Sequence, residues 1–300
     1  MSRCTLCPRA CGVDRDVSLG ACRATSRLTL SRAALHDGEE PCLSPKGKSG
    51  AVFFSGCALG CVFCQNDAIS GADPFGIEVG EERFCEILLD LQKQGAENVD
   101  LVTGDHFILQ IAAALRRVRP QLSVPVIFNC SGYETVEQLR LLDGLVDIYL
   151  PDFKFASESL AARLSRAADY PRVAAAALSE MHRQVGDCVF DGEGKLLSGL
   201  LIRHLVLPNH ADDSLAVLDI LDALFPDKES VRLSLMRQFT PMPSCREDDL
   251  RRPLTTLEYR RVTARAEELG FLGYVQEKSS VGADAIPAFD GTGVLSSPQR

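Results

Sequence analysis

Three cysteines in one short stretch have the spacing of iron–sulfur cluster ligands. Cys57, Cys61 and Cys64 are arranged as C-x3-C-x2-C within residues 54–66. A cubane cluster contains four irons and normally takes four cysteines. Three ligands with no obvious fourth leave one iron open, where a substrate or cofactor can bind directly. Gly56 and Gly60 can adopt positive φ and bring backbone N–H groups close to the cluster sulfides.

A structural zinc site is the alternative interpretation of these thiols. Its fourth ligand would be His36, the one histidine upstream of the three cysteines. Structural zinc sites usually bring their ligands as two close pairs, so three cysteines in one loop fit that pattern less well.

A second group of cysteines lies near the N-terminus. Cys4, Cys7, Cys11 and Cys22 are spaced C-x2-C-x3-C-x10-C, and Cys42 is a fifth candidate ligand. Four cysteines complete a closed tetrahedral site, which predicts a metal here. Zinc would stabilise a head too small to hold its own core, and a second iron–sulfur cluster would relay electrons or contact the substrate. A set of free thiols is the third interpretation.

The remaining cysteines are more typical of packing than of ligation, because buried cysteine is common. They are Cys85, Cys130, Cys188 and Cys245. Cys130 is the exception, because it lies at the carboxyl end of a predicted strand, where a ligand would bind.

Composition limits the class of protein. The chain has 300 residues, of which 46% are hydrophobic, enough for a full core, and its formal net charge of −9 argues against bulk nucleic-acid binding. No stretch approaches the ~20 apolar residues of a membrane helix, and the start has no apolar leader. Twelve cysteines in such a chain favour a reducing cytoplasm and metal ligation over disulfides.

Apolar runs and helical patterns alternate from residue 50 onward. The predicted strands are residues 51–55, 99–102, 124–129, 146–150, 201–207 and 231–236. Each is a continuous apolar run, as expected for parallel strands covered on both faces. The predicted helices are residues 84–91, 106–118, 134–142, 157–168, 171–185, 214–225 and 255–269. Thr255 and Glu258 form a capping-box pattern at the start of the last helix.

This alternation predicts an α/β fold, a partial (β/α)6 TIM-like barrel with right-handed crossovers. We expect a cysteine-rich, loop-like head over residues 1–48, the barrel over 49–290 and a mobile tail over 291–300. Ligands in such folds bind at the carboxyl ends of the strands. The loop with Cys57 directly follows the first predicted strand and is therefore at that end.

The sequence resembles the radical S-adenosylmethionine (SAM) superfamily and, within it, the pyruvate formate-lyase activating enzyme family and its PflX-like branch. The resemblance covers about residues 4–293. The segments that carry it are residues 4–15, 39–42, 53–66, 129–134, 149–154, 180–186 and 202–208.

The resemblance implies two cofactors, a [4Fe–4S] cluster on Cys57, Cys61 and Cys64, and SAM chelated to the open iron. One electron from a flavodoxin- or ferredoxin-type donor would release a 5′-deoxyadenosyl radical that abstracts a substrate hydrogen. Phe63 corresponds to the aromatic residue that lies beside the SAM adenine. Neither a membrane nor nucleic acid is expected as a partner, because the chain has no membrane-length apolar stretch and a net charge of −9.

Further cofactor contacts follow from the same resemblance. Thr103, Asp105 and His106 stand where the superfamily has Gly-Gly-Glu-Pro, which meets the SAM amino group, so the sequence departs from the pattern there. Asp105 can still accept from an ammonium. His106 is equally well explained as a hydrogen-bonding residue at a helix start. Asn129 and Ser131 correspond to contacts with the ribose or carboxylate.

The last candidate cofactor-binding residues lie on two further predicted strands or at their ends. Asp152 and Lys154 resemble an Asp-x-Lys pair that reaches SAM, and a simple exposed ion pair is the alternative. His204 matches a histidine near the adenosyl group, and a satisfied core histidine is the alternative. Because strand side chains alternate, one of Arg203 and His204 must point inward.

Three functions fit these patterns. The first is activation of a glycyl-radical enzyme, a protein substrate. The second is radical SAM modification of a small molecule, peptide or RNA. The third, from another class, is an iron–sulfur electron-transfer protein, which requires a fourth cysteine for the main cluster. Activating enzymes with extra clusters place the additional cysteines after the radical motif, whereas this chain has them before it.

Overall fold

The computed structural model describes residues 3–242, 245–276 and 287–295. One continuous sheet runs through the molecule, with the strand order β10-β9-β8-β6-β5-β4-β2-β1-β3, and β7 pairs with β8. The strands are β1 Thr29–His36, β2 Ser49–Phe54, β3 Ile77–Glu78, β4 Val99–Val102, β5 Val126–Cys130, β6 Ile148–Pro151, β7 Val189–Phe190, β8 Leu196–Leu205, β9 Val231–Met236 and β10 Gly273–Val275.

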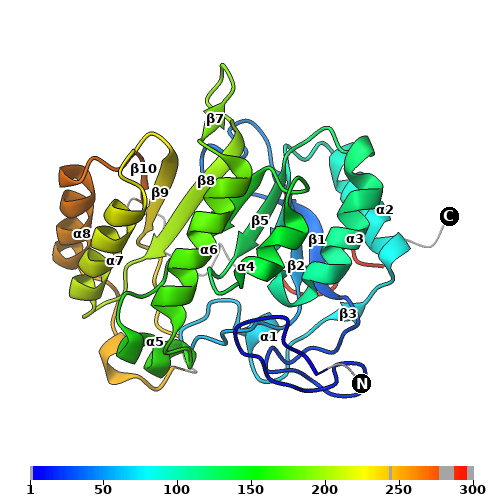
Figure 1. Ribbon diagram of the computed structural model, residues 1–300, viewed down its shortest axis with the longest axis horizontal. Coiled ribbons are helices and arrows are strands. Elements are labelled where there is room, and N and C mark those ends of the chain that lie inside the picture. Colours follow the sequence, from blue (N-terminus) through cyan, green and yellow to red (C-terminus); the bar gives the residue numbers. More distant parts are fainter. Residues whose placement is uncertain (1–2, 243–244, 277–286, 296–300) are drawn as a thin grey trace.

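Helices cover the outer face of this sheet (Figure 1). The α-helices are α1 Asp67–Ser70, α2 Glu81–Lys93, α3 Ile108–Val118, α4 Val136–Leu139, α5 Glu158–Ser165, α6 Tyr170–Val185, α7 Ala211–Leu224 and α8 Thr256–Glu268. The short 3-10 helices are η1 Asp105–Phe107, η2 Arg119–Gln121, η3 Arg140–Leu142 and η4 Asp248–Leu250. Within the described part of the chain, no helix is long and apolar enough to cross a membrane.

The predicted α/β barrel fold is confirmed. β2, β4, β5, β6, β8, β9 and β10 pair in parallel along the sheet. β2, β4, β5 and β6 are buried along their whole length, as continuous apolar runs predict for strands covered on both faces. All these strands run in one direction, so their carboxyl ends share one edge.

The N-terminal region differs from the predicted loop-like head. Residues 3–28 have no helix or strand, but β1 pairs antiparallel with β2, with His36 opposite Ser49, and also with β3. The predicted boundary at residue 48 therefore separates two paired strands. Leu30 and Ala33 bury one side of β1 against the core, and this contact joins the strand to the barrel.

One predicted helix is much shorter in the structure than expected. The helix predicted over residues 134–142 is a single turn, α4, followed by η3. Its start is fixed by Thr135 and Gln138, which form a capping box that the sequence prediction did not use. The predicted capping box of Thr255 and Glu258 is confirmed at the start of α8.

Residues 37–48 lie between β1 and β2 and pack against the sheet at the opposite end from the strand carboxyl termini. Cys42 and Leu43 belong to a small buried cluster together with Ile127, Ile148, Leu150, Leu196 and Leu201. The Leu196 N–H donates to the Cys42 carbonyl at 2.8 Å, and the Asn98 amide donates to the Leu43 carbonyl at 2.8 Å. This connection therefore forms the floor of the partial barrel.

Candidate functional site

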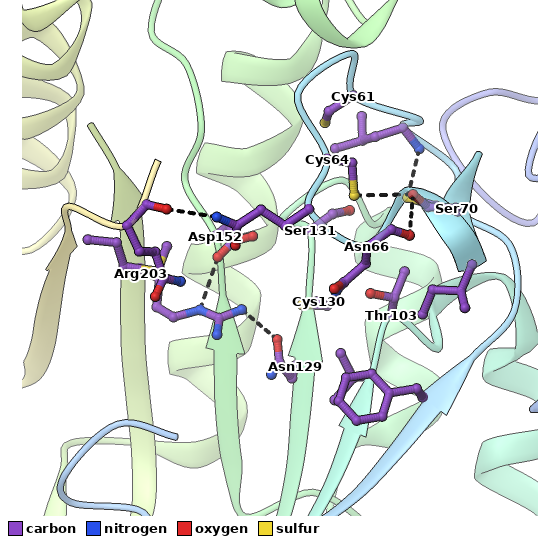
Figure 2. Close-up of a pocket in the computed structure, with 18 of the residues that line it drawn as sticks. Cys61, Cys64, Asn66, Ser70, Thr103, Asn129, Cys130, Ser131, Asp152 and Arg203 are labelled. Carbon is purple, nitrogen blue, oxygen red and sulfur yellow. Dashed lines mark hydrogen bonds and ion pairs between the residues drawn. The ribbon is translucent and has the colours of Figure 1, made fainter. Parts of the chain in front are cut away.

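A pocket opens where the strands end, and Figure 2 shows that its polar side chains come from several strands and from the cysteine loop. The strands β4, β5, β6 and β8 each contribute at or just beyond their ends. The lining includes the predicted residues Cys57, Cys61, Cys64, Thr103, Asn129, Ser131, Asp152 and Lys154, together with Cys130. It also includes His36, the candidate zinc ligand, together with Arg203 and Gln238. Further lining residues, which were not predicted as site residues, are Glu39, Glu40, Phe53, Met236 and Gln276.

The three cysteines lie on the loop between β2 and α1, and all three line the pocket. The loop contacts the head at its first turn, where the Cys57 N–H donates to the Cys22 carbonyl at 3.0 Å. Gly56 has a φ of +94°, and a Cβ there would lie 2.6 Å from that carbonyl. Only glycine allows this approach without displacement.

Each of the three sulfurs has a hydrogen-bond donor. Ser165 at the end of α5 donates its hydroxyl to Cys61 Sγ at 2.9 Å, and Ser70 donates to Cys64 Sγ at 3.1 Å. The Leu59 N–H lies 3.4 Å from Cys57 Sγ. Donors of this kind stabilise thiolates and tune the potential of a cluster that they hold.

Arg9 connects the head to this loop. Its guanidinium donates to the carbonyls of Ala58 at 2.8 Å and Leu59 at 3.2 Å, both inside the C-x3-C segment. It also donates to the Ser165 carbonyl at 2.7 Å and lies over the Tyr133 ring. One side chain from residues 3–28 therefore holds both the cysteine loop and the helix end that supplies the donor to Cys61.

These features fit a [4Fe–4S] cluster. Burial raises the pKa of Cys57 and Cys64, so an ionised thiol without a metal is unfavourable at these positions. The positive charge of a bound metal would stabilise the thiolates. Across the described ranges, no three His, Cys, Asp or Glu side chains converge on a single-ion position. A cluster of four irons holds its cysteines further apart than one ion does, so that finding does not bear on a cluster.

The head cysteines lie near one another. The Cys4 side chain contacts that of Cys11, and Cys7 lies close to Cys4 and Cys22. Cys7 and Cys22 are buried, and burial raises the pKa of both, to about 11 for Cys7. Whether this set holds a metal, and which one, stays a prediction.

Opposite the cysteines, a largely buried ion network crosses three strand ends. Arg203 donates to Asp152 Oδ1 at 3.0 Å and to the Asn129 side-chain oxygen at 2.6 Å (Figure 2). Lys154 pairs with the other Asp152 oxygen. Burial alone would raise the pKa of Asp152, but the two cations outweigh it and hold that pKa below its usual range. Asp152 is therefore ionised and fixed in place.

The hydroxyl of Tyr170 fixes the backbone beside this network. It lies 2.8 Å from the carbonyls of Ser131 and Asp152 and accepts from the Lys154 N–H at 2.9 Å. Gly132, with a φ of +74°, leaves room for the Asp152 carbonyl, which a Cβ would approach to 2.3 Å. The ends of β5 and β6 are thus held together around one buried phenol.

On β8 the inward residue is Arg203. His204 faces α7, where Nδ1 lies 2.7 Å from the Phe153 carbonyl and Nε2 lies 2.8 Å from Ser214 Oγ. Both ring nitrogens are occupied and the side chain is 1% exposed. This placement corresponds to the core-histidine alternative and puts Arg203 at the pocket in its place.

Three other predicted cofactor residues lie outside the pocket lining. Phe63 packs edge-on against Phe155. His106 Nε2 lies 2.8 Å from the Ser55 carbonyl, and burial lowers its pKa to about 4. Asp105 is fully buried, and burial raises its pKa to about 6. Their contacts with a cofactor stay predictions.

Thr103 does line the pocket, and its backbone is strained. Its φ is +60°, which is unfavourable for a β-branched residue. The Thr103 N–H donates to the Asn129 carbonyl at 2.8 Å, and the next residue is Gly104, where a Cβ would lie 2.5 Å from Ile111. Strain of this kind is concentrated at functional sites.

Comparisons with known proteins agree with this geometry. Residues 44–165, from just before β2 to the end of α5, match the family described as "4Fe-4S single cluster domain". The folds of SuiB from Streptococcus suis and HydG, a maturase of the [FeFe]-hydrogenase, align with TM-scores of 0.52 and 0.51. Each is 10% identical, and they cover 76% and 72% of this chain. The chain spans about half the length of these two proteins, 48% of each.

A radical SAM methyltransferase from Sphaerobacter thermophilus also shares the fold, with a TM-score of 0.52 and 14% identity over 79% of this chain and 68% of that one. The matched family describes a domain with a single 4Fe–4S cluster, and the match includes the three loop cysteines. The solved structures show that the chain shares their fold.

A curated relative is 31% identical over 274 residues, 88% of this chain and 74% of its own length. It is the uncharacterized protein MJ0674 of Methanocaldococcus jannaschii, and the chain belongs to its family.

Proposed function

We propose that this chain is a radical SAM enzyme whose cluster is held by Cys57, Cys61 and Cys64. The observation that carries the proposal is the placement of these three thiols on one face of the strand-end pocket, each with a hydrogen-bond donor. With SAM bound, such a cluster would pass one electron from an external donor to the sulfonium, releasing methionine and a 5′-deoxyadenosyl radical that would take a hydrogen atom from the substrate.

The residues around the cysteines have supporting roles in this proposal. Lys154 and Arg203 provide fixed positive charge for the SAM carboxylate, and Asn129 and Ser131 provide polar contacts for the ribose. Ser70 and Ser165 hold Cys64 and Cys61 by hydrogen bonds. Burial of the pocket floor and walls keeps water from a reactive radical.

The substrate class within this chemistry has two candidates. One is a protein, as in activation of a glycyl-radical enzyme, and the other is a small molecule, peptide or RNA. We also propose a cytoplasmic location and a flavodoxin- or ferredoxin-type electron donor, as the family resemblance implies. The proposal that the chain belongs to the PflX-like branch rests on the same family resemblance.

Single cysteine variants provide the experiment. Cys57→Ala, Cys61→Ala and Cys64→Ala should each lose the reconstituted cluster signal and the formation of 5′-deoxyadenosine. Cys85→Ala, on helix α2 away from the pocket, is the matched control and should retain both. Retained SAM cleavage in any of the three loop variants would contradict the ligand assignment.

An electron-transfer protein remains the second candidate because Cys130 lines the same pocket and offers a fourth thiol. With four cysteine ligands no iron would be open to SAM. Cys130→Ala separates the two functions. It should keep its iron and its SAM cleavage if three cysteines hold the cluster, and should lose iron if Cys130 is the fourth ligand.

A further inference from the structure

Residues 3–28, the part of the head that has no helix or strand, bring four thiols together. These cysteines are Cys4, Cys7, Cys11 and Cys22. The side chains of Cys4 and Cys11 are in contact, and Cys7 lies close to Cys4 and Cys22. Cys42, the fifth candidate ligand, belongs instead to the small buried cluster with Leu43. The four thiols of one short segment therefore form a complete set of metal ligands.

Backbone N–H groups are directed at these sulfurs in a repeated local arrangement. At three head cysteines the N–H two residues further on lies against the sulfur, namely Arg9 for Cys7, Val13 for Cys11 and Ala24 for Cys22. The same relation occurs in the cysteine loop, with Leu59 for Cys57 and Asn66 for Cys64. Such donors stabilise a sulfur that carries negative charge, as a metal-bound thiolate does. The head therefore repeats the local arrangement of the candidate cluster ligands.

The backbone beside two of the head cysteines is strained. Ala10, which precedes Cys11, has a φ of +40°, and Arg23, which follows Cys22, has a φ of +62°. Residues other than glycine rarely adopt such values. Cys7 and Cys22 are only 8% and 5% exposed, although their segment has no regular secondary structure to hold them in place. A bound metal would offset the cost of this conformation, because metal binding to thiolates contributes folding free energy.

An iron–sulfur cluster fits the four thiols better than a single zinc ion. In the described ranges, which include all four head cysteines, no three His, Cys, Asp or Glu side chains converge on a single-ion position. A tetrahedral zinc site requires every sulfur to lie ~2.3 Å from one point. A cluster distributes its cysteines over several irons, so its ligands lie further apart. The loop cysteines, which the proposed function assigns to a cluster, likewise form no single-ion position.

One hydrogen bond connects the two sets of cysteines. The Cys57 N–H donates to the Cys22 carbonyl at 3.0 Å, so the two sulfurs are joined through covalent bonds and this single hydrogen bond. Arg23, next to Cys22, donates to the Ser70 carbonyl at 2.8 Å, and the Ser70 hydroxyl donates to Cys64 Sγ. Electrons cross a short bonded path faster than an equal distance through a gap. The contact between the head and the loop is therefore suited to electron transfer.

We propose that Cys4, Cys7, Cys11 and Cys22 hold a second [4Fe–4S] cluster, which passes electrons from the external donor to the cluster on the loop. The head cluster gains one electron as the donor is oxidised, and it loses that electron as the loop cluster is reduced. No proton or ligand moves in either step. The relay role rests on the proposed radical SAM function, whereas the binding of iron by the head does not.

Metal content tests the site without an assay of catalysis. The full chain is reconstituted anaerobically with iron and sulfide, and its iron, sulfide and zinc are counted. The unmodified protein and the control Cys85→Ala, on α2, should each bind about eight irons, four per cluster. The double variant Cys4→Ala/Cys7→Ala should keep about four.

A variant of the loop measures the head by itself. Cys57→Ala/Cys61→Ala/Cys64→Ala lacks the loop ligands and should still bind about four irons. Because this variant leaves the head intact, it decides the proposal even if Cys4→Ala/Cys7→Ala does not fold. The relay is tested by EPR of the reduced protein. Two clusters this close should couple magnetically, so the spectrum of the unmodified protein should be broader than the sum of the spectra of the two variants.

Several results would overturn the proposal. About four irons in the unmodified protein, with either zinc or free thiols in the head, would show that the head holds no cluster. Loss of all iron from the loop variant would show the same, and full iron content in Cys4→Ala/Cys7→Ala would place the ligands elsewhere. An EPR spectrum equal to the sum of the two variants would remove the relay. Failure of the radical SAM function is recognised separately, because a protein with about eight irons would then form no 5′-deoxyadenosine from SAM and a strong reductant.

Discussion

The Ser165 hydroxyl donates a hydrogen bond of 2.9 Å to Cys61 Sγ, joining the end of α5 to the cysteine loop 104 residues earlier in the chain. Ser165 is fully buried, so water cannot replace its hydroxyl. If Cys61 ligates the cluster, this bond stabilises charge on its sulfur, and more so in the reduced cluster, which carries the greater negative charge.

Ser165→Ala should therefore lower the reduction potential of the cluster. We expect a shift on the order of tens of millivolts, because a one-electron couple changes tenfold per 59 mV and a net hydrogen bond contributes ~1 kcal/mol. The measurement is a redox titration followed by EPR. Ser165→Thr should restore the potential, and Ser179→Ala, on the exposed face of α6, should not change it. An unchanged potential in Ser165→Ala would show that the bond does not tune the cluster.

The clamp formed by Arg9 should control how firmly the loop keeps its iron. Arg9→Lys replaces a planar fork that reaches Ala58, Leu59 and Ser165 with a single point donor. We expect iron release to a chelator about tenfold faster, corresponding to ~1.4 kcal/mol. Arg27→Lys alters an exposed arginine paired with Glu78 and is the matched control. Equal release rates in the two variants would contradict the role of Arg9.

The buried pair of Arg203 and Asp152 should contribute more to stability than an exposed pair. Their side chains are 17% and 16% exposed, against 69% and 56% for Arg27 and Glu78. Arg203→Gln should lower the free energy of unfolding by about 3 kcal/mol because it leaves buried carboxylates short of a partner. Arg27→Gln should change it by ~0–1 kcal/mol. Urea titrations of both variants measure the difference, and losses of similar size would contradict the account.

Glu134 should make the fold less stable as the pH rises. Burial, with Asp105 nearby, raises its pKa from 4.5 to about 8; Cys130, Tyr149 and Tyr170 are the other titratable groups close to it. The unfolded chain releases this proton near pH 4.5 and the folded protein near pH 8, so stability falls between these values. Asp105, with a pKa of about 6, acts in the same direction in its own range.

Glu134→Gln should flatten that decline, because glutamine is neutral at every pH. The measurement is the unfolding temperature between pH 5.5 and 8.0, with Glu137→Gln, in the first turn of α4, as the control. A slope in Glu134→Gln equal to that of the unmodified protein would show that Glu134 is not protonated in the fold.

The sequence predicted the bounds of β4 and β9 to the residue because most positions in each are apolar and polar or turn residues lie on both sides. β1 was missed because its alternation is weak, with a burial pattern that changes along the strand. Its place is set by pairing with β2, a contact that local patterns do not encode.

The site residues also divide into those that local sequence patterns predict and those that depend on how distant segments pack. Residues that end or closely follow predicted strands, such as Thr103, Asn129 and Asp152, lie in the pocket, since strand ends share one edge. The choice between Arg203 and His204 depends on which face of β8 turns inward, and a continuous apolar run leaves that face undefined. Glu39 and Glu40 reach the pocket along a connection with no periodic pattern. Their only signal was the resemblance of residues 39–42 to the same family.

The most direct measurement of the central claim is anaerobic reconstitution of the full chain, with iron and sulfide counted and SAM then added with a strong reductant. The account predicts about four irons and formation of 5′-deoxyadenosine, or about eight irons if the head cysteines hold a second cluster. A fully loaded, reducible cluster that yields no 5′-deoxyadenosine would contradict it and favour electron transfer.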